Sequence, residues 1–353
     1  MAMFDAQTIA KFADMVQVYK DVDISDLHIP TLESAWSLAY RQDPADFVAD
    51  QVFPVFGVNQ ISGKYARWSK ENFTTPAGIA WRPSTMLPQA ELNLDERGAF
   101  ECIRYALEAP LPVDLPEVQD KGMSIEMATT YLITDALRLK REINFATNYF
   151  TSGIWGNTWT GAASGETGTE AQTGALTFRQ MNDTDNSDPL EVFMDARLAA
   201  KKLTLKMPNV ALMGEQVYQK LRIHPQLTNL YRNPQGNEQV PTKLNEQMLA
   251  VALDLDKIIV GKAMYNTAAP GATANLDWVF GKDCLVAYVG APGLLTQMAG
   301  MNFSFNTSLG GYDTAVRQVP DLRTLATFYQ GFQCYVQKIV SNGCGVFLHN
   351  IIA

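Results

Sequence analysis

The chain has 353 residues, of which 18% are charged and 47% hydrophobic, and its formal net charge is −9. This length predicts two interlocked domains or one large, elaborated domain. The acidic balance and the lack of any run of Lys or Arg argue against a dedicated nucleic-acid-binding protein, which would carry a basic patch. A charged share below the usual value of about 25% suits a subunit whose surface is largely covered by neighbouring molecules.

The cysteines and the N-terminal segment indicate the compartment. Four cysteines lie far apart without a C-x-x-C pair, which favours neither a zinc site nor a disulfide scaffold and points to a reducing cytoplasm. The N-terminus carries Asp5 early and has no basic region followed by an apolar run. No stretch approaches the ~18 consecutive apolar residues of a membrane-spanning helix. We therefore expect neither export nor membrane insertion.

Residues 1–58 predict an N-terminal arm, and residues 59–112 predict an extended loop. The arm has too few long apolar faces to fold alone and needs another surface to pack against. In the loop, alternating polarity at 91–95 and 103–108 predicts strands, whereas the prolines of 73–88 exclude a helix or a central strand. Such a long excursion is predicted to contact another copy of the chain. The predicted contact residues are Trp68, Phe73, Trp81, Met86 and Leu87.

The strongest helix prediction covers residues 117–150, where apolar residues recur at spacings of three and four. At 1.5 Å per residue this helix would be about 45–50 Å long, which is typical of an elongated subunit. The following tract, 151–180, is rich in Gly, Ser, Thr and Ala and predicts a surface insertion. The predicted buried stripe comprises Ala128, Leu132, Ala136, Leu139, Ile143, Ala146 and Phe150, and the predicted polar face carries Arg138, Lys140, Arg141 and Glu142.

A new unit is predicted over residues 188–303. Asp188 is expected to cap a helix that has Pro189 in its first position and Glu191 completing the capping pattern, and that stops at Pro208. The elements expected next are a strand at 210–213, helices at 215–223 and 242–253, a strand at 257–260, and a hairpin of 276–280 with 284–289 turned at Gly281.

The last part of the chain, 304–353, returns to strand character. Strands are predicted at 335–340 and 346–352, separated by a turn at 341–343. The sequence contains no internal repeat. Together these patterns predict an α+β fold.

None of the polar patterns predicts a catalytic, cofactor-binding or metal site. Residues 182–188 resemble the first half of a calcium loop, but Asp188 stands where glycine is required and Met194 where glutamate is required. His224 precedes a proline at a helix end, where a cation would complement the helix dipole. The phosphate-binding and serine-hydrolase motifs are also missing. The three histidines, which are scattered, are His28, His224 and His349.

Three passages of the sequence are similar to those of a known family. They are the helix opening at 187–189 with the continuous passage 207–225, the helix-strand passage 243–266, and the segment 278–288. The local sequence of these passages resembles that of major capsid proteins of tailed bacteriophages, which share the Hong Kong 97-type fold. The order of arm, extended loop, long helix, α+β unit and returning strands resembles that family over most of the chain.

This resemblance implies the place of each segment in a capsid subunit. It makes 59–112 an extended β-hairpin loop that reaches a neighbouring subunit, and 117–150 the spine helix of a peripheral domain that begins at residue 113 and runs to 187. It makes 188–303 an axial domain whose loops meet at five-fold and six-fold centres, and 304–353 strands that return to the peripheral and axial domains.

The implied function is that of a structural virion protein, not an enzyme. Copies would assemble in the host cytoplasm into pentamers and hexamers of an icosahedral head that encloses double-stranded DNA without sequence-specific binding. The other implied partners are a scaffolding protein, a portal and a decoration protein. The scaffolding protein is expected to be separate, because no long charged N-terminal extension resembles a fused scaffold. Some members crosslink a lysine to an asparagine; Lys64, Lys70 and Asn342 have suitable side chains but match no motif.

Three alternatives remain open at this point. A host-encoded nanocompartment shell would share the fold but hold protein cargo. A carbohydrate-binding adhesin would use the tryptophans of predicted loops. An α+β enzyme would need a pocket with converging polar groups. The tryptophans placed in predicted loops are Trp68, Trp81, Trp155 and Trp159.

Overall fold

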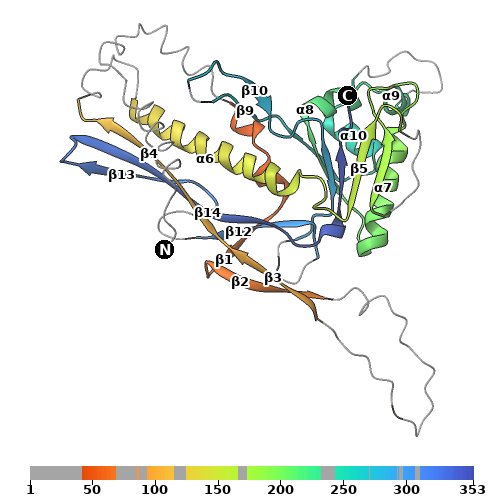
Figure 1. Cartoon of the computed structure of the whole chain (residues 1–353), viewed down its shortest axis with the longest axis horizontal. Coiled ribbons are helices and arrows are strands. Elements are labelled where there is room, and N and C mark those ends of the chain that lie inside the picture. Colours follow the sequence, from red (N-terminus) through yellow and green to blue (C-terminus); the bar gives the residue numbers. More distant parts are fainter. Residues whose placement is uncertain are drawn as a thin grey trace.

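The structure, a computed structural model, combines two large β-sheets and two two-stranded ones with helices and is elongated (Figure 1). It describes residues 42–68, 86, 94–114, 125–165, 173–231, 243–269, 271–291, 293, 297–306 and 311–353. No described helix is long and apolar enough to cross a lipid bilayer.

The first sheet has five strands and is organised by one long strand, β14 (Ala326–Ile339). Along one side β14 pairs with β4 (Ile103–Pro112), antiparallel over its first ten residues. Along the other side it pairs first with β13 (Ala315–Asp321) and then with β12 (Gly300–Phe305). The parallel strand β1 (Val55–Val58) completes the sheet beside β12. Strands β4, β14 and β13 form a three-stranded extension, here called the finger, that reaches away from the other sheet (Figure 1).

A single long helix, α6 (Ile125–Tyr149), lies over one face of the finger (Figure 1). Near its N-terminal half, Ile133 and Leu137 pack with Leu111 of β4 and Tyr329 of β14 in one apolar cluster. The helix predicted at 117–150 is therefore present and ends at Tyr149, while residues 117–124 lie outside the described part of the chain.

The buried face of α6 differs from the predicted one. Leu132 of the predicted stripe is 55% exposed, whereas the predicted polar residues Arg141 and Glu142 are only 4% and 1% exposed. The prediction failed because apolar residues occur on more than one side of this helix, and periodicity alone does not identify the side that meets a sheet. The buried side chains are Ile133, Leu137, Arg141, Glu142, Phe145 and Tyr149.

The second sheet has six strands in the order β6-β5-β15-β11-β7-β8. Four helices accompany it, and their apolar side chains share its main core cluster. The strands are β5 (Asn157–Ala162), β6 (Ala175–Arg179), β7 (Val210–Gly214), β8 (Lys257–Gly261), β11 (Cys284–Ala287) and β15 (Gly345–His349). The helices are α7 (Pro189–Thr204), α8 (Glu215–Leu221), α9 (Pro225–Asn229) and α10 (Glu246–Ala252).

The prediction of a surface insertion at 151–180 is wrong for most of the residues that the structure describes there. This tract supplies β5 and β6, and Trp155 and Trp159 are 4% and 0% exposed. Along β5, buried and half-buried residues alternate, as expected for a strand whose faces differ. Because β5 lies parallel to β15, nearly two hundred residues later, the pairing that makes it a strand cannot be read locally. The two tryptophans therefore belong to the core and not to a glycan-binding loop.

The hairpin predicted between 276–280 and 284–289 is also wrong. β10 (Leu276–Trp278) pairs with β9 (Met264–Asn266), and both edges of β11 are occupied by β7 and β15. The chain does turn at Gly281, whose φ of +55° lies in the left-handed region that glycine favours. The turn residue was correctly identified, but it joins strands of two different sheets.

Two other predictions are confirmed. Asp188 accepts a hydrogen bond from the Glu191 backbone N–H at 3.0 Å, and Pro189 is the first residue of α7. The predicted strand at 335–340 is the last part of β14, and the one at 346–352 corresponds to β15. Between them a short 3-10 turn, Asn342–Cys344, carries the chain from the first sheet to the second.

Close packing of α6 on the finger predicts the effect of filling one glycine. A Cβ atom at Gly331 would overlap the Ile133 side chain and lie 2.9 Å from Leu137 Cδ1. Gly331→Ala should lower the free energy of unfolding by about 1–3 kcal/mol, because neither side chain can move away freely. Urea unfolding measures this, with Gly57→Ala as the matched variant, since its Cβ would meet only Asn306 Nδ2, at 3.8 Å. Equal stability of the two variants would contradict the packing described for α6.

Candidate functional site

Two strands, β2 (Ser62–Trp68) and β3 (Leu94–Glu101), form a separate antiparallel hairpin. Phe100 lies opposite Gly63, and Tyr65 lies opposite Gly98. Each ring covers the opposing glycine so closely that a Cβ atom at Gly63 would lie 2.7 Å from the Phe100 ring, and one at Gly98 would overlap Tyr65. These crossed aromatic-glycine pairs fix the register of the hairpin.

The base of this hairpin is attached to the first sheet. The Phe100 ring stacks on Phe303 of β12 with centroids 4.5 Å apart, and Tyr65 stacks on the same ring at 5.8 Å. Tyr65 and Phe100 are consequently 6% and 7% exposed. From this anchored base β2 and β3 lead away from the sheet (Figure 1). The hairpin is therefore fixed to the first sheet at its base by three aromatic rings.

The five predicted contact residues belong to this region. Trp68 is the last residue of β2 and is paired with Leu94 after an irregularity in register. Met86 is 89% exposed. The other three, Phe73, Trp81 and Leu87, lie outside the described residues, so the contact remains a prediction.

A second feature, the arm junction, joins the chain before β1 to α6. Both carboxylate oxygens of Glu142 accept hydrogen bonds, from the backbone N–H groups of Val48 and Ala49, each at 2.9 Å. These donors open the short helix α3 (Ala49–Val52), so the carboxylate satisfies N–H groups that the helix leaves unpaired. Burial raises the pKa of the Glu142 carboxyl to about 7, and the two N–H donors act in the opposite direction.

Arg141, the residue before Glu142 in α6, connects the junction to a third segment, the one that contains Tyr312. Its guanidinium pairs with Asp50 at 2.5 Å, donates to the Tyr312 carbonyl at 2.6 Å and lies 4.5 Å from the centre of the Tyr312 ring. Asn302 of β12 donates to the Phe53 carbonyl at 3.2 Å and contacts the Tyr312 hydroxyl at 3.1 Å. The arm junction therefore connects residues 48–53, α6, β12 and the segment at 312.

Gln42, the first described residue, is attached to β9 and not to α6. The side-chain amide of Gln42 accepts from the Met264 N–H at 3.0 Å and donates to the Met264 carbonyl at 2.6 Å. It thus occupies both backbone groups of one residue of β9, as a neighbouring strand would. Residues 42–53 are in this way held at both ends.

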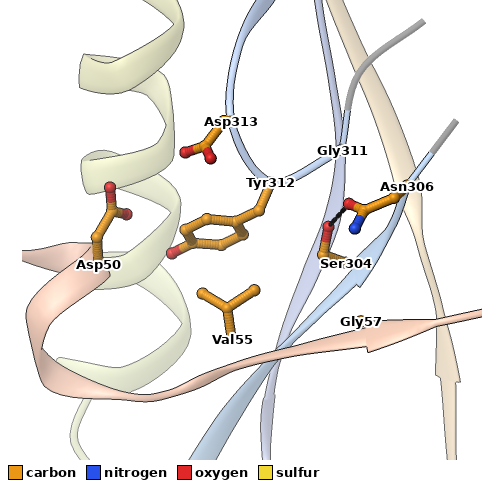
Figure 2. A pocket seen from close by; sticks show the side chains of 8 residues that line it. All are labelled: Asp50, Val55, Gly57, Ser304, Asn306, Gly311, Tyr312 and Asp313. Atoms are coloured by element: carbon orange, nitrogen blue, oxygen red, sulfur yellow. Dashed lines mark hydrogen bonds between the residues drawn. The ribbon is translucent and has the colours of Figure 1, made fainter. Parts of the chain in front are cut away.

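An open pocket of about 440 Å³ lies beside the arm junction (Figure 2). The Tyr312 ring extends toward Asp50, whose carboxylate is already paired with Arg141. Within the described parts of the chain, no three His, Cys, Asp or Glu side chains are grouped to hold a metal ion. The lining residues are Asp50, Val55, Gly57, Ser304, Asn306, Gly311, Tyr312 and Asp313.

The polar residues singled out from the sequence have structural partners. Asp183, in the calcium-like tract, accepts from Asn186 and pairs with Arg179 at 3.5 Å. His224 is fully buried, its Nε2 lies 3.1 Å from Ser187 Oγ, and burial lowers its pKa. His224 therefore has a packing role inside the protein. His349, at the end of β15, pairs with Asp283 at 2.9 Å. His28 lies outside the described residues.

The lysine and asparagine considered for crosslinking lie in different elements. Lys64 is in β2 opposite Ala99, and Asn342 begins the turn between β14 and β15. Lys70 lies outside the described residues. Sequence reasoning missed the arm junction, because neighbouring Arg and Glu residues in a helix look like an ordinary solvated pair whether or not they are buried.

Comparison with known proteins gives both sequence and fold relatives. No protein-family model matches the chain. The major capsid protein of Burkholderia phage BcepMu is 24% identical over 260 residues, which cover 72% of this chain and 74% of that protein. A phage-related protein from Bordetella bronchiseptica has a TM-score of 0.62 at 17% identity, covering 92% of this chain and 97% of its own. The capsid of cyanophage P-SCSP1u has a TM-score of 0.54 at 11% identity, covering 94% and 95%. The chain therefore has the phage capsid fold, as predicted.

The arm junction makes a prediction for Glu142. In Glu142→Gln one carboxylate oxygen becomes an NH2 group, which cannot accept from Val48 or Ala49. A buried N–H left without an acceptor should lower the free energy of unfolding by about 1–3 kcal/mol. Glu126→Gln, at an exposed site of the same helix, should change it by less than about 0.5 kcal/mol. If Glu142→Gln unfolds at the same urea concentration as wild type, the two N–H donors do not depend on this carboxylate.

Proposed function

We propose that the chain is a major capsid protein of a tailed phage, a structural subunit that assembles with copies of itself into an icosahedral head around double-stranded DNA. The observation that carries this is the sequence relation to a phage major capsid protein over 72% of the chain, together with a fold shared with a cyanophage capsid over 94% of it. The assembled protein would be located in the virion capsid.

The structure offers surfaces suited to such assembly. The hairpin β2-β3 leads away from an anchored base, and the end of the arm is fixed, since Val48 to Phe53 pack into the core beside α6 and Gln42 is hydrogen-bonded to β9. Assembly of a closed shell requires heterologous contacts that close, spread over many weak interactions that allow errors to be corrected. Pentamers and hexamers would form through the extended loop and the arm, with Trp68, Phe73, Trp81, Met86 and Leu87 in contact with a neighbour.

The division of the chain remains a proposal with one change. We assign 1–58 to the arm, 59–112 to the extended loop, 113–156, 180–187 and part of 304–353 to the peripheral domain, and 188–303 to the axial domain. Because β5 and β6 lie in the same sheet as β7, β8 and β11, we assign 157–179 to the axial domain also.

The role of the chain is structural and not catalytic. The net charge of −9 favours a lining that does not bind phosphates tightly, so DNA can be packed against it. A separate scaffolding protein, a portal and a decoration protein are the further partners expected of such a head.

Electron microscopy of the purified protein tests the proposal directly. Negative staining should show hollow icosahedral particles or their pentameric and hexameric precursors. Particles that co-purify with a cargo enzyme from the natural host would instead support a nanocompartment, and monomers under all conditions of salt and concentration would count against a shell protein.

A deletion tests the extended loop separately. Removing residues 74–87 should leave a soluble protein with the circular dichroism of wild type, because the base of the hairpin is held by Tyr65 and Phe100. The same deletion should abolish particles. The variant Trp81→Ala, with the loop length unchanged, tests the predicted contact alone and should reduce the yield of particles. Abundant normal particles from the deletion would show that the loop is not an assembly element.

A further inference from the structure

The outer edge of the finger is formed by β4, which among the described residues pairs only with β14. Most of its side chains are exposed, including two large apolar ones, Ile103 at 51% and Leu107 at 36%. A long, flat strand with exposed apolar side chains is a template for pairing with another strand.

The direction of the backbone groups along β4 follows from one hydrogen bond beyond its end. The Val113 N–H donates to the Leu325 carbonyl at 3.0 Å, which continues the pairing of β4 with β14. Backbone groups of successive strand residues point to opposite sides. Odd-numbered residues of β4 therefore direct their N–H and C=O groups to β14, and even-numbered residues direct theirs to the open edge.

Only a short part of this edge has backbone N–H groups free to pair with another strand, and these groups are placed symmetrically about one residue. At one end, the Cys102 N–H is already bonded to the Ile61 carbonyl at 2.7 Å. At the other end, Pro110 and Pro112 have no N–H. The outward N–H donors still available belong to Arg104, Ala106 and Glu108, a set centred on Ala106.

The charged side chains on this edge are also placed symmetrically about Ala106. Arg104 and Glu108 lie two residues on either side of Ala106, on the face of the finger opposite to α6. Glu108 is oriented by Gln330 at 2.6 Å, which in turn accepts from Arg317 at 2.9 Å. The carboxylate is thus held at the edge of the sheet by a row of side chains across three strands.

We propose that β4 pairs with β4 of a second copy of this chain, antiparallel about a two-fold axis through Ala106. In this register Arg104 of each copy faces Glu108 of the other, and the Arg104, Ala106 and Glu108 backbones exchange hydrogen bonds across the axis. On the opposite face Tyr105 meets Leu107 of the second copy, which covers apolar surface that is otherwise exposed. Only this register pairs opposite charges twice and leaves no proline at a bonding position.

The pairing identifies a two-fold contact within the shell proposed above and rests on that function for its setting. Two copies joined in this way would turn two finger sheets into one continuous sheet. The partner is another copy because the edge is complementary to itself and each half satisfies the other.

Cysteine crosslinking tests the register. Residues facing each other in a hydrogen-bonded antiparallel pair have Cα atoms about 5.5 Å apart, within the range that a disulfide spans. Ala106→Cys should therefore form disulfide-linked dimers on mild oxidation of assembled protein. Arg104→Cys and Glu108→Cys should not crosslink alone but should crosslink when the two are mixed before assembly. Ala128→Cys, exposed on α6, is the control, and the four native cysteines are buried.

Charge reversal supplies an independent readout. Arg104→Glu or Glu108→Arg places like charges opposite each other at two sites of the contact and should lower the yield of dimers or particles by roughly tenfold at low salt. The double variant, Arg104→Glu with Glu108→Arg, restores both pairs and should recover most of the loss. A merely structural role of either residue would make the double variant worse than the single ones.

The outcomes separate the pairing from the shell function. Particles of Ala106→Cys that do not crosslink, or crosslinks at Ala128→Cys of equal yield, would overturn the β4 pairing and leave the capsid function standing. Crosslinked Ala106→Cys dimers from a protein that never forms particles would support the pairing and count against the capsid function.

Discussion

Two neighbouring charged side chains, Arg141 and Glu142, are buried near the middle of α6, and the positions of three other segments depend on them. A buried charge is costly unless hydrogen bonds and an opposite charge compensate it. Among the described residues, the Glu142 carboxylate accepts from the first N–H groups of α3, and the Arg141 guanidinium donates to Asp50 and to the Tyr312 carbonyl. The arm, the helix and the segment after β12 must therefore come together or leave unpaired charges in the core.

Local signals in the sequence predicted local structure well. Asp188, Pro189 and Glu191 fixed the start of α7, because a helix cap depends only on residues within one turn. The strands β5 and β6 were not predicted, since the glycine- and threonine-rich tract that contains them forms strands only where β5 pairs with the distant β15 and β6 pairs with β5. The same limit applies to the candidate site: nothing near Arg141 indicates that Asp50 will form an ion pair with it and that the Tyr312 carbonyl will accept its hydrogen bond.

The two sheets serve different purposes in the molecule. The six-stranded sheet is enclosed with α7 to α10 around the largest apolar cluster and gives the chain a compact body. The five-stranded sheet is covered on one face by α6 along the finger and carries the features that extend outward, namely the finger and the anchored hairpin. The described edges and projections thus lie mainly on the five-stranded sheet, while a second core cluster joins α6 to the six-stranded sheet.

The position of β15 has a consequence for biosynthesis. This strand, residues 345–349, lies in the interior of the six-stranded sheet between β5 and β11, and β14 just before it is the central strand of the other sheet. Neither sheet can close until these last strands have left the ribosome. A nascent chain that has not yet released β14 and β15 therefore has neither sheet complete, and the closing of both sheets waits for these two strands.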